Sequence, residues 1–113
     1  MQIDDQLSYW LDVAVSRLRH QFDPHQILLF GSWARGTATR RSDIDLLIIC
    51  ETTAPPLERI DSVLKLLRDA PSPIEAIVYT PAELERRQSS PFIRRVLQEG
   101  IVLYERGKTS AGC

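Results

Sequence analysis

The chain has 113 residues, of which 43% are hydrophobic and 26% are charged, and its formal net charge is -1. This length supports one small core, and the near-neutral charge argues against broad binding to nucleic acid. No stretch approaches the roughly 18 consecutive apolar residues of a membrane span, and the acidic start at Asp4 and Asp5 is unlike a signal peptide. We therefore expect a cytoplasmic protein without membrane contact. Cys50, inside an apolar run, and Cys113, the last residue, suggest no disulfide framework.

The first part of the chain predicts a helix and then a short buried strand. Apolar residues recur at helical spacing over residues 5–21, at Leu7, Trp10, Leu11, Ala14 and Leu18. Pro24 ends that helix. The wholly apolar run from Ile27 to Phe30 is typical of a strand covered on both faces, and Gly31 and Ser32 then turn the chain into a short helix.

The clearest strand in the sequence runs from Asp43 to Cys50. Because side chains alternate along a strand, Asp43 and Asp45 share one face at one end. A second helix is predicted by the spacing of Leu57, Ile60, Val63, Leu64 and Leu67. Residues 74–79 form a third strand, with Glu75 near its start.

Two helix-start signals follow. Thr80 and Glu83 form a capping box around Pro81, and Ser90 repeats the cap before Pro91. The second of these helices has an apolar side formed by Phe92, Ile93, Val96 and Leu97, and it is expected to end at Gly100, before an edge strand over 101–104. Residues 83–87 and the pair Arg94 and Arg95 are expected to be solvated helix faces. We place one domain over 1–106 and a disordered tail over 107–113.

Strand connections predict an α/β (α+β) domain built on a single small mixed sheet. Only ten residues separate Ser32 from Asp43, which is short for a parallel crossover, so the first two strands should be antiparallel. The second helix is long enough to return the chain and set the third strand parallel to the second. This arrangement brings Glu75 beside Asp43 and Asp45.

The turn after the first strand is a candidate phosphate site. Gly31 allows close approach of a phosphate to the backbone, and Ser32 adds a hydroxyl. Alone, such a turn is usually only a turn. It is not a P-loop, because Thr37 stands where that loop has its lysine.

The acid pair is a candidate metal site. Two carboxylates on one face repel each other unless cations lie between them, although solvation at a strand end would also explain them. If they bind Mg²⁺, a two-ion site would serve a nucleotide triphosphate. Glu75 would then complete the metal site or act as the base for an acceptor hydroxyl.

The string from Gly31 to Leu46, with Gly-Ser, ten residues, and then Asp-x-Asp, resembles the signature of the DNA polymerase β-type nucleotidyltransferase superfamily. The small size is similar to its minimal nucleotidyltransferase (MNT) branch, the antitoxin partners of HEPN-domain toxins. The resemblance implies that Gly31 and Ser32 hold ATP, that Asp43 and Asp45 hold Mg²⁺, and that Glu75 takes the place of a third acid, commonly aspartate.

Several neighbouring residues have two readings. Arg35 either contacts phosphate or ties the loop to the aspartates, and Arg40 and Arg41 are either solvated or face the triphosphate or a partner. We count Arg35 and Arg41 among the nucleotide-binding candidates. Trp33 could stack on a base, but packing beside the short helix is favoured.

The resemblance implies Mg²⁺-dependent transfer of AMP from ATP to a hydroxyl, with pyrophosphate leaving. Its acceptor would be a HEPN toxin, modified on tyrosine, with which the chain forms a hetero-oligomer as antitoxin. Two alternatives stay open: neutralisation of the partner by steric binding alone, and a nucleotidyltransferase that acts on a small molecule.

Overall fold

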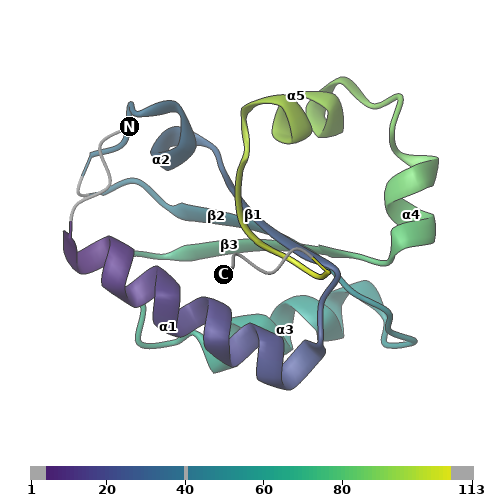
Figure 1. The fold of residues 1–113 in the computed structure, drawn as a ribbon, viewed down its shortest axis with the longest axis horizontal. Coiled ribbons are helices and arrows are strands. Elements are labelled where there is room, and N and C mark those ends of the chain that lie inside the picture. The colour runs from purple at the N-terminus through teal and green to yellow at the C-terminus, as the bar shows by residue number, and fades with distance from the viewer. Residues whose placement is uncertain (1–4, 40, 108–113) are drawn as a thin grey trace.

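The computed structural model describes residues 5–39 and 41–107 and contains one four-stranded sheet with helices on both faces (Figure 1). In chain order the elements are α1 (Asp5–Phe22), β1 (Gln26–Phe30), α2 (Ser32–Arg35), β2 (Ile44–Ile49), α3 (Pro56–Leu66), β3 (Ile74–Tyr79), α4 (Pro81–Arg86), α5 (Pro91–Glu99) and β4 (Ile101–Glu105). The predicted α/β class with a single mixed sheet is confirmed. Beyond Gly107 the predicted tail lies outside the described residues, and the domain limit at 106 stays a prediction.

The strand order is β3-β2-β1-β4. β1 and β2 are antiparallel, with Phe30 opposite Asp45, and β2 and β3 are parallel, with Asp45 beside Glu75. β4 runs antiparallel to β1 at the other edge. Both predicted strand orientations are therefore confirmed, and the end of β1 meets the starts of β2 and β3.

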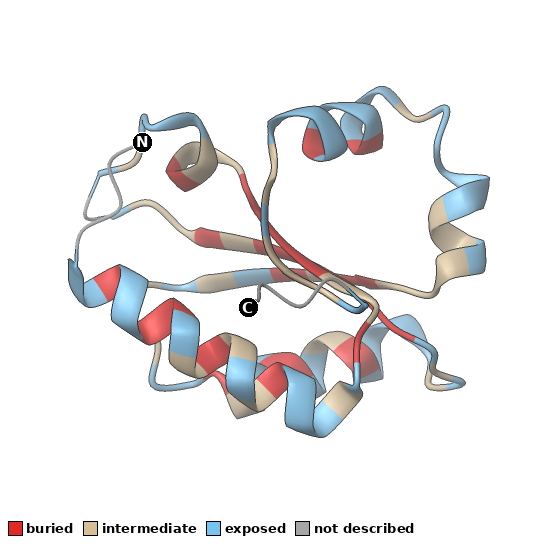
Figure 2. Ribbon diagram, viewed as in Figure 1, coloured by how far each residue is buried: buried red, intermediate tan, exposed pale blue. Residues whose placement is uncertain are grey.

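The two faces of the sheet are covered to different depths. Figure 1 shows α1 and α3 on one face, and Figure 2 shows the buried side of α1 turned toward the sheet. That face holds the larger core, which includes Trp10, Leu18, Ile27, Leu46 and Val63. On the other face a smaller cluster joins Leu28, Phe30, Leu47 and Ile49 to Val96 of α5. This thinner cover leaves room for a site.

Some apolar residues of α3 and α5 lie outside both cores. Leu57 and Leu64 are 81% and 39% exposed, although their spacing matched the buried side of a helix. Phe92 and Leu97, on the predicted apolar side of α5, are 51% and 40% exposed. Of that apolar side, the thin layer formed by α5 buries Ile93 and Val96. No helix in the described ranges is long and apolar enough to cross a membrane.

A buried ion pair links α3 to the start of α4. Arg59, only 8% exposed, donates hydrogen bonds from Nη1 and Nη2 to the Glu83 carboxylate at 2.6 and 3.2 Å. It also donates to the backbone oxygens of Ala54 and Val78. Glu83 closes the predicted capping box with Thr80. Residues 83–87 are therefore not uniformly solvated, because Glu83 neutralises a buried cation.

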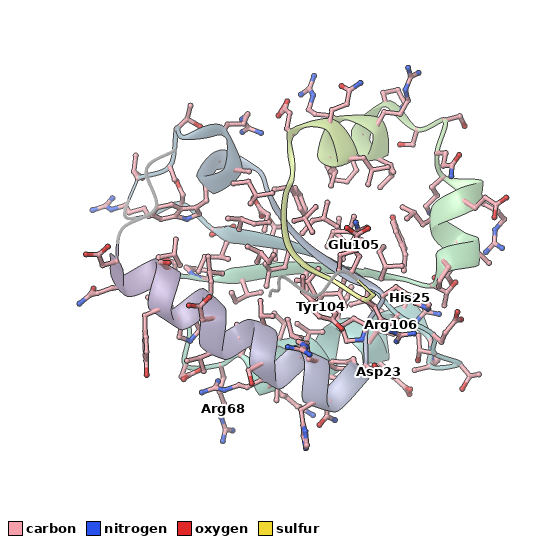
Figure 3. All side chains as sticks on the ribbon, viewed as in Figure 1. Asp23, His25, Arg68, Tyr104, Glu105 and Arg106 are labelled. Atoms are coloured by element: carbon pink, nitrogen blue, oxygen red, sulfur yellow. The ribbon has the colours of Figure 1, made fainter. Side chains whose placement is uncertain are left out.

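A second set of contacts lies at the same end of the sheet, where β2 ends and β1 begins. The side chain of Arg106 binds Asp23, and the backbone N–H of Arg106 donates to the backbone oxygen of His25 (Figure 3). His25 in turn donates its backbone N–H to Ile49, the last residue of β2. This junction is thus separated from Asp45 by the length of β2.

Candidate active site

Asp45 and Glu75 are neighbours across the parallel strands β2 and β3. Burial raises the pKa of Asp45 to about 6, and the charges of Glu75 and Asp43 and a hydrogen bond with Glu75 add to this shift, while Arg35 opposes it. These effects destabilise the ionised form of the acid, which a bound cation would stabilise. Asp43 lies just before β2, which begins one residue later than predicted, yet Asp43 is close enough for its charge to act on Asp45.

Gly31 lies directly against Asp45. Its φ of 75° is in the region that favours glycine, and a Cβ added to it would fall 2.0 Å from Oδ2 of Asp45. The backbone at the end of β1 therefore reaches the carboxylate without an intervening side chain. Ser32 follows as the first residue of α2 and is partly exposed.

The arginines near this turn have different surroundings. Nη1 of Arg35 lies 3.7 Å from Oε1 of Glu99, so α5 holds this side chain beside the acids. Arg41 is exposed, and its backbone N–H donates to Oγ1 of Thr39. Arg40 lies outside the described residues. Of the two described arginines, Arg35 is the one whose charge acts on Asp45.

A cavity of about 560 Å³ opens at this end of the sheet. Of the predicted site residues, Gly31, Arg35, Asp45 and Glu75 line it, whereas Ser32, Asp43 and Arg41 do not. Its volume is within the usual range for small-molecule sites. The structure therefore brings together four of the seven predicted residues around one space.

One wall of the cavity was missed in the sequence. α5 lines it with Phe92, Arg95, Val96 and Glu99. Arg95 was expected to be a solvated surface residue, but it is an exposed residue on the cavity wall. The spacing of three, four and seven residues along one helix face is a signal that could have identified this wall. Ile60 and Leu64 of α3 add an apolar part on the other side.

The strand order, the Gly-Ser turn and the paired acids agree with one known family. A family model described as "Polymerase beta, Nucleotidyltransferase" matches residues 14–109. The chain belongs to this nucleotidyltransferase family. Two proteins of Methanocaldococcus jannaschii, each named "Putative protein adenylyltransferase", are similar to it. One is 42% identical over 79 residues, 70% of this chain and 77% of the relative. The other is 35% identical over 106 residues, 85% of this chain and 70% of the relative.

Solved structures share the fold of this nucleotidyltransferase. A toxin–antitoxin structure of an MntA-HpeT mutant aligns with a TM-score of 0.67 at 22% identity, over 94% of this chain and 76% of that one. A toxin–antitoxin structure with AMP-PNP gives a TM-score of 0.61 at 24% identity, over 85% of this chain and 73% of that one. These likenesses agree with the fold described above.

Trp33 is a packing residue next to the site. It is 9% exposed, and its indole Nε1 donates to the backbone oxygen of Ser42 at 3.4 Å. This contact ties α2 to the residue before Asp43. The interpretation of Trp33 as a packing residue is therefore confirmed, and it helps to set the distance between the turn and the acids.

The chemistry of the site suits a hard cation. Asp43, Asp45 and Glu75 offer carboxylate oxygens, the ligands that Mg²⁺ prefers. Burial, and next the charges of Glu75 and Asp43, raise the pKa of Asp45, so its ionised form would be stabilised by a cation. Within the described part of the chain, no three His, Cys, Asp or Glu side chains are grouped closely enough to hold a metal ion by themselves. Magnesium commonly uses one or two carboxylates together with substrate phosphates, which is compatible with this arrangement.

Proposed function

We propose that this nucleotidyltransferase is Mg²⁺-dependent and moves AMP from ATP to a hydroxyl of a partner protein. The observation that carries the proposal is the pairing of Asp45 with Glu75, against Gly31, at the wall of one cavity. The two relatives named for protein adenylyl transfer support the choice of a protein as acceptor.

In the proposed transfer, the acceptor oxygen bonds to the α-phosphorus while the bond from that phosphorus to the bridging oxygen breaks. Pyrophosphate leaves with the electron pair, and Glu75 accepts the proton of the hydroxyl. Gly31 and Ser32 hold the triphosphate, and Arg35 and Arg41 contact its oxygens. When bound by Asp43, Asp45 and Glu75, two Mg²⁺ ions would supply the positive charge that the phosphates need.

The partner is proposed to be a HEPN-domain toxin, silenced by modification of a tyrosine. Two solved toxin–antitoxin structures share the fold of this chain, which supports a toxin as the partner. The chain would then act in the cytoplasm as an antitoxin and form a hetero-oligomer with its toxin.

The test is transfer of label from ATP labelled at the α-phosphate to the product of the adjacent gene, with Mg²⁺ present. We expect label on the partner and none with Asp45→Asn. Asp12→Asn is the matched control, because Asp12 is an exposed acid on α1 outside the cavity. Transfer by folded Asp45→Asn protein at the wild-type rate would contradict the proposal.

The same experiment separates the alternatives. If Asp43→Asn and Asp45→Asn together leave neutralisation of the toxin intact, the chain acts by steric binding. If label appears on an aminoglycoside or another small alcohol and not on protein, the acceptor is a small molecule.

A further inference from the structure

β3 is an edge strand with a free side. Among the described strands it pairs only with β2, because the sheet order begins β3-β2. The carbonyls of Pro73 and Tyr79 accept from the N–H groups of Ile44 and Cys50 at 2.8 and 3.0 Å. Backbone groups alternate in direction along a strand. The N–H and C=O groups of residues 75, 77 and 79 therefore point toward β2, and those of Ile74, Ala76 and Val78 point away from the sheet.

Only part of that outer edge is already used. The carbonyl of Val78 accepts a hydrogen bond from Nη1 of Arg59, which closes one end. Among the described residues, no partner is recorded for the outward N–H and C=O groups of Ile74 and Ala76. Ile74 and Ala76 both line the cavity that contains Asp45 and Glu75. The unpaired edge therefore continues directly into the active site.

Apolar side chains flank this edge on both faces. Leu64 and Ile60 of α3 lie on the face of Ile74 and Ala76, and Phe92 lies on the face of Glu75. Leu64 is 39% exposed and Phe92 51%. Open backbone groups between two apolar walls match an extended peptide, whose own backbone can pair while its side chains alternate between the walls.

We propose that the open edge of β3 adds a strand of the acceptor protein, which pairs with Ile74 and Ala76 and places its hydroxyl over Glu75. The proposal rests on the function proposed above and adds how the acceptor is recognised. A residue opposite Glu75 lies on the same face as Glu75, and the residues on either side of it meet Ile60 and Leu64.

The geometry favours a long side chain on the acceptor residue. Strands lie about 4.8 Å apart, so an added strand would be about 10 Å from β2 and Asp45. A serine hydroxyl, one bond beyond Cβ, stays over the added strand, whereas a phenol extends across Glu75 toward Asp45. The edge-to-face pair of Phe92 with Phe30, at 6.0 Å, offers that ring an aromatic wall.

Charge adds a second requirement. Arg95 lines the cavity, and the described residues show no ion pair for it, while Arg35 is engaged by Glu99. An acidic residue on the Phe92 side of the segment would complement Arg95. The occupant is thus an extended segment with apolar residues around a tyrosine and an acid nearby.

The direct test is amide hydrogen exchange on ¹⁵N-labelled protein with a capped synthetic peptide, Asp-Val-Tyr-Val-Thr, at millimolar concentration. Protection should appear at the amides of Ile74 and Ala76, and not change at Glu75 and Ile77, which already bond to β2. No new protection at Ile74 and Ala76 would overturn the proposal. Protection that grows with protein concentration without peptide would also overturn it, because the occupant would be a second copy.

A variant provides the second test. Ile74→Pro removes one outward N–H at the first residue of an edge strand, where proline is tolerated, and Ile74→Val keeps that N–H. The proline variant should raise the KM for the labelled partner about tenfold, and the valine variant should not. If Asp45→Asn abolishes transfer but folded Ile74→Pro keeps a normal KM for the partner, strand addition is rejected and the proposed function stands. Transfer that survives Asp45→Asn would instead reject the proposed function.

Discussion

The carboxylate of Asp45 occupies the space that a side chain at Gly31 would need, since a Cβ there would lie 2.0 Å from Oδ2 of Asp45. Gly31→Ala must therefore displace the turn or the acid, and its φ of 75° adds strain of about 1–2 kcal/mol. We expect AMP transfer to fall about 100-fold, because displacements near 1 Å have such effects on catalysis.

Gly36 is the matched control for this substitution. Its φ is 78°, but nothing lies within 4 Å of a Cβ added to it. Gly36→Ala should therefore lose comparable stability from backbone strain while keeping its activity. Thermal unfolding and label transfer measured on both variants separate the two effects, and equal losses of activity would argue against the contact with Asp45.

Asp45 should destabilise the fold at neutral pH. Its folded pKa of about 6 lies above the ordinary 3.8, so the fold favours the protonated acid. The stability that this form provides is fully present below about pH 3.8 and is lost as pH rises through about 6. Asp45→Asn should raise the free energy of unfolding by about 1–2 kcal/mol at pH 8, with the difference vanishing near pH 4. Urea denaturation without metal at both pH values measures this, and a less stable variant at pH 8 would refute it.

The Arg59–Glu83 pair should stabilise the fold at neutral pH. The hydrogen bonds from Arg59, and next that from the Thr80 backbone, lower the pKa of Glu83 to about 2. Its contribution is therefore present above about 4.5 and lost as pH falls toward about 2. Glu83→Gln should cost about 2–3 kcal/mol at pH 7, because it leaves a buried cation without its partner. Glu85→Gln, an exposed acid of the same helix, is the control in denaturant titrations, and equal losses would contradict the assignment.

Arg35→Met distinguishes the two readings of that residue. If Arg35 acts on Asp45, its removal lets the pKa of Asp45 rise further, and the acid limb of the rate profile should move to higher pH. If it contacts phosphate instead, the KM for ATP should rise at every pH. Arg86→Met, an exposed arginine of α4 outside the cavity, should leave both measurements unchanged.

The strand pairings could be predicted because they depend on loop length and on the alternation of side chains. Ten residues between Ser32 and Asp43 left room for an antiparallel pair, and a helix-length connection brought Glu75 beside Asp45. The contact of Gly31 with Asp45 follows from the same register.

The surroundings of the site could not be predicted in the same way. Apolar spacing marks one side of a helix, but it does not tell whether a second layer covers that side, and Phe92 and Leu64 are in fact exposed. The burial of Arg59 depends on Glu83, which lies 24 residues later in the chain. Contacts of this kind are set by tertiary packing.

The direction of β4 matters for how the protein can be handled. Its first residue, Ile101, pairs with Leu29 near the acids, whereas Glu105 pairs with Gln26 at the far end of β1. β4 is also the edge strand opposite β3. A fluorophore or surface tether attached at Gly107 would therefore sit across the molecule from the acids and from the free edge, which makes that position suitable for binding assays on immobilised protein.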